Sequence, residues 1–187
     1  MRLIIKIGIG LAAVMAVLLG VVSTRPDSFR VERSTTVAAP ADVVFAQVND
    51  FHAWSAWSPY FKLDPAQKLG FDGAPSGVGA IHSWQSEKVG EGRMTIVESR
   101  PNERVATQLE FIKPMSSTAQ AVFTFAPAPG GVTVSWAMEG RNTLLGKVFA
   151  LFVDMDELLG KDFERGLADL KTVSETRARE ARLATAP

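Results

Sequence analysis

The sequence contains no cysteine, which excludes disulfide bonds, thiolate catalysis and cysteine-ligated metal sites. It contains only two histidines, His52 and His82, so a metal site would need both of them, or carboxylates in their place. Neither sign of charge dominates, because 20 lysine and arginine residues are balanced by 20 aspartate and glutamate residues. The basic surface typical of nucleic-acid-binding proteins is therefore absent. We expect no nucleic-acid partner, no bound metal ion and no cofactor.

The length of 187 residues suits one domain with a short appendage. We divide the chain into an N-terminal apolar segment, a polar linker, a folded domain and a charged, alanine-rich tail that we expect to be flexible. These parts cover residues 1–23, 24–28, 29–175 and 176–187.

The N-terminal segment is apolar throughout residues 3–22 except at Lys6. About 20 apolar residues are enough for a helix that spans a bilayer, so we favour an uncleaved, single-pass transmembrane anchor. A cleaved signal peptide, which would release a secreted domain, is the second alternative, although the cleavage pattern is poor. A buried core helix is the third. Arg2 and Lys6 favour a cytoplasmic N-terminus and an extracytoplasmic domain, but three arginines within residues 25–33 weaken this orientation.

The domain begins with a strand-like alternation at residues 29–37, followed by a short helix at 43–48 and a second short helix or turn at 51–60. Turns rich in glycine and proline separate the later strand-like segments, which favours an antiparallel meander with one buried face. Six such segments follow, at residues 63–71, 79–86, 92–99, 104–112, 118–126 and 132–139.

The last predicted element is one long helix over residues 144–179. Apolar residues recur there at spacings of one to four, which is typical of a helix with a single buried stripe. The acidic residues within 154–157 are interpreted as part of its solvated face.

Several local motifs accompany this order of elements: VERS at 31–34 with APADVVF at 39–45, FHAWSAWSP at 51–59, GEGRMTI at 90–96, VSWAMEG at 134–140 and GKDFERGL at 160–167. Together they resemble the polyketide-cyclase/START-like superfamily, also called SRPBCC. The resemblance implies an α+β helix-grip fold, in which a curved antiparallel sheet of about seven strands wraps around a long C-terminal helix. It does not specify an activity, because this superfamily includes cyclases, lipid carriers and hormone receptors.

A sheet bent around one helix leaves an internal space that either encloses a ligand or is filled by side chains. The candidate ligand-binding residues are large apolar side chains placed near that space by the resemblance. They are Trp54, Trp57, Trp84, Met94, Phe111, Phe123, Trp136, Phe149 and Phe152. The alternative is that the same side chains form an ordinary core, which large aromatic residues often dominate.

His82 is the one weak candidate for catalysis. It shares strand parity with Ala80 and Trp84, so it faces either the internal space, as a proton carrier, or the solvent in the opposite register. Glu98 and Glu110 are alternative acid–base groups. No nucleophile elbow or catalytic triad spacing is present in the sequence.

The sequence therefore favours a module that binds a small hydrophobic or lipid-like ligand at a membrane. A cyclase- or dehydratase-like enzyme is the first alternative. A chaperone or interaction module with a filled interior is the second.

Overall fold

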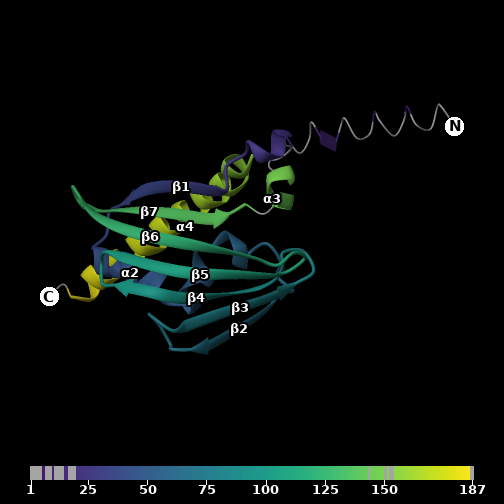
Figure 1. The fold of residues 1–187 in the computed structure, drawn as a ribbon. Helices are drawn as coiled ribbons and strands as arrows, with labels where there is room; N and C mark the ends of the chain where they lie inside the picture. Colours follow the sequence, from purple (N-terminus) through teal and green to yellow (C-terminus); the bar gives the residue numbers. More distant parts are fainter. Residues whose placement is uncertain are drawn as a thin grey trace.

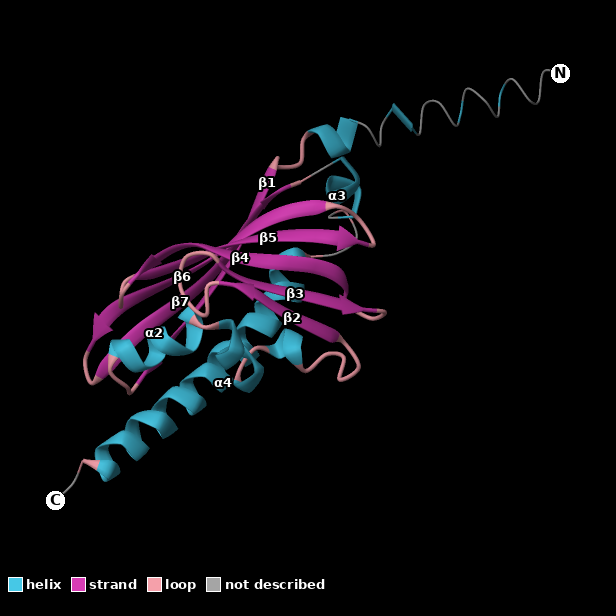
Figure 2. Cartoon of the chain, turned by 90° about the horizontal axis from the view of Figure 1, so that it is seen from below, coloured by secondary structure: helices cyan, strands magenta, loops and turns pink. Residues whose placement is uncertain are grey.

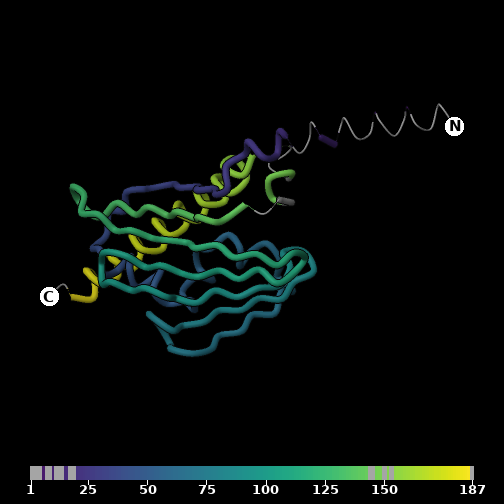
Figure 3. Tube along the Cα trace, viewed as in Figure 1, coloured from purple at the N-terminus to yellow at the C-terminus, as the bar shows by residue number. Residues whose placement is uncertain are grey.

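The computed structural model describes residues 6, 10, 15–16, 20–142, 144–149, 151 and 154–185. Its body is one seven-stranded antiparallel sheet in the order β1-β7-β6-β5-β4-β3-β2 (Figure 1). The strands are β1 (Ser28–Val37), β2 (Lys68–Gly73), β3 (Ala80–Ser86), β4 (Gly90–Arg100), β5 (Arg104–Lys113), β6 (Ser117–Ala128) and β7 (Gly131–Arg141). Figure 3 follows the trace as it meanders from β2 to β7, with β1 lying beside β7.

The helices cover one face of this sheet, which curves around them (Figure 2). They are α2 (Ala41–Asn49), the 3-10 helices η1 (Phe51–Ala56) and η2 (Pro59–Phe61), and α4 (Met155–Ala184). The short helix α3 (Leu144–Phe149) follows β7 beyond the end of the sheet (Figure 1). Helix α4 runs along β1, since Lys171 donates to the carbonyl of Thr36 at 2.9 Å and Glu175 accepts from the backbone of Ala38 at 2.8 Å. The predicted helix-grip arrangement is confirmed.

The covered face of the sheet is built from rows of residues that the antiparallel register places side by side. One row runs through Phe71, His82, Met94, Leu109 and Ala119. All but Phe71 are buried, and residues on either side of them along each strand point to the other face. The alternation seen in the sequence thus gives one apolar, covered face.

The predicted final helix is divided in the structure. Helix α3 ends at Phe149, and α4 begins at Met155 after Asp154, whose extended backbone and carboxylate cap the new helix. Oδ1 of Asp154 accepts from the backbone N–H groups of Asp156 at 2.9 Å and Glu157 at 3.3 Å. An acidic residue expected on a solvated helix face is therefore a helix N-cap.

The C-terminal part of α4 also extends further than expected. The helix continues to Ala184, and Ala178 is buried within the part predicted to be a flexible tail. The predicted strand at residues 63–71 is shorter, because β2 starts only at Lys68.

The predicted N-terminal anchor, residues 1–23, lies largely outside the described residues. Within the part that is described, no helix has both the length and the apolar character needed to cross a bilayer. Residues 20–23 are helical and lead into β1 through the linker.

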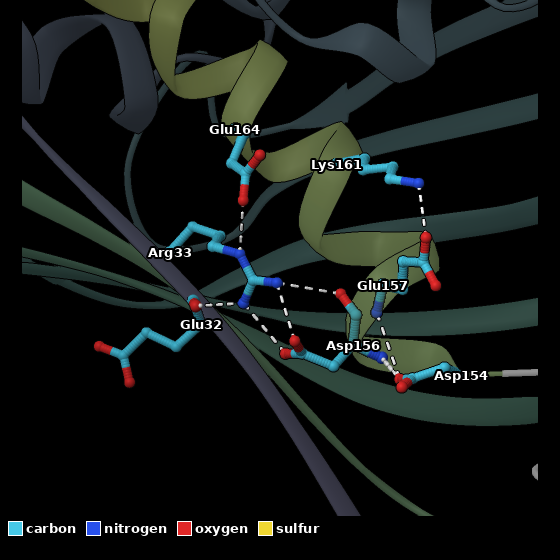
Figure 4. A network of polar contacts seen from close by, with 7 residues as sticks. All are labelled: Glu32, Arg33, Asp154, Asp156, Glu157, Lys161 and Glu164. Carbon is cyan, nitrogen blue, oxygen red and sulfur yellow. Dashed lines mark hydrogen bonds and ion pairs between the residues drawn. The ribbon is translucent and has the colours of Figure 1, made fainter.

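An arginine clamp fixes the first turns of α4 against β1 (Figure 4). Arg33 donates through Nε to Glu164 at 2.9 Å and through Nη2 to the carboxylate of Asp156 at 2.8 Å. Its Nη1 donates to the backbone carbonyl of Glu32 at 2.8 Å. The hydrogen bonds to Asp156 and Glu164 raise the pKa of the Arg33 guanidinium above its usual range. Gly160 leaves room for the guanidinium, because a Cβ at that position would collide with Nη2.

Candidate functional site

A cavity of about 250 Å³ lies between the covered face of the sheet, the segment after η1 and the start of α4. Most of its lining is apolar, as expected for a small-molecule site. The lining residues are Ser58, Tyr60, Phe61, Leu63, Gln67, His82, Trp84, Val89, Met94, Leu109, Phe111, Met138 and Leu159. The interior is therefore hollow at this end, and beside it aromatic and aliphatic side chains pack into a buried core.

Trp84 forms part of the wall because the sheet leaves space for its ring. Trp84 pairs with Gly92 on β4, and a Cβ at Gly92 would lie only 2.5 Å from the indole. The indole also meets the ring of Phe111 edge to face, with centroids 6.0 Å apart. A glycine in the neighbouring strand thus lets a large ring lie across the sheet.

His82 is the most unusual lining residue, because it is an ionisable side chain that is only 2% exposed. Its ring packs against the rings of Phe61 and Phe71, at centroid distances of 4.7 and 5.2 Å. Nδ1 lies 3.3 Å from the carbonyl oxygen of Gly70. Burial lowers the pKa of His82 to about 4, against a smaller opposing effect of the Gly70 carbonyl. The imidazole is therefore neutral at neutral pH.

Three other polar side chains border the cavity. Ser58 is completely buried, and its hydroxyl has no hydrogen-bond partner among the described residues. Burial raises the pKa of the Tyr60 hydroxyl, so the phenol stays protonated. Gln67 donates to the carbonyls of Tyr60 at 3.2 Å and Phe61 at 3.0 Å, which ties the residues after η1 to the approach of β2.

Asp64 and Ser86 connect two segments whose neighbouring residues, Leu63 and Val89, line the cavity. The hydroxyl of Ser86 donates to Asp64 at 2.6 Å and accepts from the backbone N–H of Val89 at 3.1 Å. Asp64 also accepts from the backbone of Ala66 at 3.0 Å, and these hydrogen bonds lower the pKa of its carboxyl. The β3–β4 hairpin is therefore held against the loop before β2.

Carboxylates are absent from the described lining of the cavity. Glu98 forms ion pairs with Arg100 and Arg104, and Glu110 pairs with Arg93 at 2.8 Å, all on the opposite face of the sheet. These two alternative acid–base groups thus do not reach the cavity. The described residues also include no group of three histidine or carboxylate side chains placed to bind a metal ion.

The structure brings only some of the candidate ligand-binding residues to the cavity. Trp84, Met94 and Phe111 line it. Phe149 belongs to α3, but its side chain is not among the described parts, and Phe152 lies outside the described residues.

The other four candidates, Trp54, Trp57, Phe123 and Trp136, form a buried aromatic cluster beside the cavity. The indole N–H of Trp54 donates to the carbonyl of Val48 at 2.9 Å, and that of Trp57 donates to the carbonyl of Gln47 at 3.0 Å. These two tryptophans therefore tie η1 to the end of α2. In this structure the alternative interpretation, an ordinary core, describes their placement.

Sequence analysis missed the lining residues contributed by the segment between η1 and β2, including Tyr60, Leu63 and Gln67. The sequence pattern predicts a strand over part of that segment, from residue 63. The dipeptide Asp64-Pro65 was an available signal for a turn there, and Asp64 does accept from the backbone of Ala66 two residues later.

Solved structures with the same fold have little sequence in common with this chain. Protein CV1439 from Chromobacterium violaceum superposes with a TM-score of 0.57 at 18% identity, covering 81% of this chain and 99% of its own. The Aha1 dimer from Colwellia psychrerythraea gives 0.57 at 12% identity, covering 79% and 96%. The di-domain ARO/CYC protein StfQ from the steffimycin biosynthetic pathway gives 0.60 at 12% identity, covering 81% of this chain and 52% of its own. At these identities the likeness concerns the fold alone.

No protein of curated function matches the chain. Residues 28–175, well over half of the sequence, match the family described as polyketide cyclase / dehydrase and lipid transport. The match spans the whole sheet, the cavity and most of α4. The chain belongs to this polyketide cyclase/dehydrase and lipid transport family, as its SRPBCC-like motifs predicted.

Proposed function

We propose that the chain binds a small hydrophobic molecule inside the cavity, beside a membrane. The observation that carries this proposal is the hollow of about 250 Å³ with a mainly apolar lining. Moving a ligand from water into such a site is favourable by about 0.8 kcal/mol for each buried methylene group. The lipid-transport part of the family description also supports a binding role.

The membrane part of the proposal depends on the apolar residues 3–22. We infer that they form an uncleaved anchor with a cytoplasmic N-terminus, which leaves the domain outside the cytoplasm. The polar residues 24–28 would then place the domain close to the bilayer surface.

The experiment compares two adjacent leucines of α4, of which only one reaches the cavity. Leu159 lines the cavity, whereas Leu158 is 52% exposed and lies outside the lining. The full chain in lipid nanodiscs is titrated calorimetrically with naphthalene, with empty nanodiscs as the blank. We expect saturable one-to-one binding that Leu159→Trp weakens by about tenfold or more, because the larger ring fills the space.

Leu158→Trp is the matched control and should bind naphthalene as the wild type does. Equal weakening by both substitutions, or no saturable binding by the wild type, would contradict binding in this cavity.

A cyclase- or dehydratase-like reaction is the second candidate, favoured by the buried His82. A neutral imidazole on the cavity is able to take a proton from a bound substrate. Binding remains the first choice because His82 has no carboxylate partner among the described residues and the cavity is small.

A further inference from the structure

The volume of the cavity limits what it can enclose. An apolar cavity of about 150 Å³ holds one benzene molecule, and a water molecule occupies about 30 Å³ in the liquid. The 250 Å³ available here therefore suits a molecule of one or two rings, and it is too small for the two acyl chains of a phospholipid.

The lining also sets the charge of the ligand. Among the described lining residues there is no lysine, arginine, aspartate or glutamate. Enclosing an ion without a partner of opposite charge is very unfavourable. Tyr60 and His82 are the ionisable groups of the lining, and both are uncharged at neutral pH. A ligand enclosed here is therefore neutral.

His82 offers the clearest polar contact for a ligand. The orientation of its ring decides which of the two nitrogen atoms is available. Because Nδ1 faces the carbonyl of Gly70, the proton of the neutral ring lies on Nδ1. Nε2 then carries a lone pair, and no described residue donates to it. Packing against Phe61 and Phe71 holds the ring in this orientation.

Ser58 is the second neutral polar side chain to consider beside the cavity. Its hydroxyl is fully buried and lacks a partner among the described residues, and the residue lines the same cavity. Buried hydroxyls are normally hydrogen-bonded, so Ser58 leaves an unused donor and acceptor next to the space that His82 borders.

We infer that the cavity selects a neutral alcohol or phenol of one or two rings, whose hydroxyl group donates a hydrogen bond to Nε2 of His82. The apolar body of the ligand lies against Trp84, Met94 and Phe111. This inference depends on the proposed function, because it names the ligand class of that same cavity.

The test compares four probes on the full chain in nanodiscs at neutral pH: 2-naphthol, 2-methoxynaphthalene, naphthalene and 2-naphthoate. We expect 2-naphthol to bind about fivefold more tightly than naphthalene, the effect of one neutral hydrogen bond. The methoxy compound, which has no O–H group to donate, should show no such gain. The anionic naphthoate should bind most weakly.

The variant His82→Phe removes the acceptor while keeping a ring in place, so it should abolish the preference for 2-naphthol over naphthalene. The matched control is His52→Phe, since His52 lies outside the lining and pairs with Asp50 on the surface at 2.9 Å. This control should keep the preference of the wild type.

The outcomes separate the two proposals. The inferred hydroxyl contact is wrong if the wild type binds 2-naphthol no more tightly than naphthalene, or binds the methoxy compound as tightly as 2-naphthol. In either case ligand binding in the cavity stands. This comparison needs no variant, so it holds even if His82→Phe does not fold. If no probe binds, the proposed function fails as well.

Discussion

His82 combines two properties that are rarely found together, an ionisable ring and an almost complete burial. Four aromatic rings surround it, namely those of Phe51, Phe61, Phe71 and Trp84. The cost of charging the ring in these surroundings is what lowers its pKa to about 4. Burial keeps the ring neutral and therefore available as a hydrogen-bond acceptor. For the same reason, protonation of His82 lowers the stability of the fold.

This coupling predicts a loss of stability in mild acid. The pKa of His82 is about 4 in the folded state and about 6.5 in the unfolded chain, so the unfolded state binds the extra proton first. The stabilisation is complete above pH 6.5 and is lost as the pH falls to 4. The free energy of unfolding should decrease by at most about 3 kcal/mol over this range because of His82 alone.

Urea unfolding at several pH values measures this effect, and a variant isolates it from the titration of carboxylates. His82→Gln cannot be protonated, so its free energy of unfolding should fall less steeply between pH 6.5 and 4 than that of the wild type. Parallel slopes for the wild type and His82→Gln would contradict a buried neutral histidine.

At the scale of elements, the strands were the most predictable part of the fold. Alternation over residues 118–126 and 132–139 requires a buried face, and β6 and β7 extend only slightly beyond these limits. The cavity was less predictable, because the sequence shows that large rings such as those of Trp54 and Trp84 are candidates for the interior but not which of them borders a void. Whether a ring lines a space depends on residues distant in sequence, such as Gly92 beside Trp84.

The division between α3 and α4 was not visible in the hydrophobic pattern, because apolar residues continue through the junction. Asp154 marks a helix start only through its N-cap hydrogen bonds. The apolar pattern on both sides of it is that of one continuous helix, so the pattern alone does not predict a new start there. This cap determines where α4 starts and therefore where Leu159 meets the cavity.

We predict that Asp154→Ala lowers the free energy of unfolding by about 1 kcal/mol, because two backbone N–H groups lose their acceptor. Asp154→Asn should retain most of the stability, since asparagine is an equally good cap. Urea denaturation followed by circular dichroism measures both variants. An alanine variant as stable as the wild type would show that the Arg33 clamp alone sets the start of α4.

At the scale of the whole molecule, the register relates the cavity to the point where the chain enters the sheet. Ser28 at the start of β1 pairs with Arg141 at the end of β7, and β6 starts beside them. The β3–β4 hairpin and the β5–β6 turn lie at this same end (Figure 1). The strand ends beside the cavity and the start of β1 therefore share one end of the sheet.

Exposed apolar side chains also occur at this end. Leu63, which lines the cavity, is 45% exposed, and Met115 in the β5–β6 turn is 60% exposed. If residues 3–22 anchor the chain, these side chains would face the bilayer, where apolar surface is favoured. A ligand would then pass between lipid and cavity without crossing much water.

This arrangement is tested by contact with lipid in the full chain reconstituted into vesicles that contain brominated phospholipids, which quench tryptophan fluorescence at short range. Met115→Glu places a charge in the β5–β6 turn and should reduce quenching, because a charged side chain is disfavoured at the apolar boundary. Val78→Glu is the matched control, since Val78 is 59% exposed in the β2–β3 loop at the opposite end of the sheet. It should be quenched as strongly as the wild type. Equal quenching of all three proteins would mean that this end of the sheet does not face the membrane, even if the chain is anchored to it.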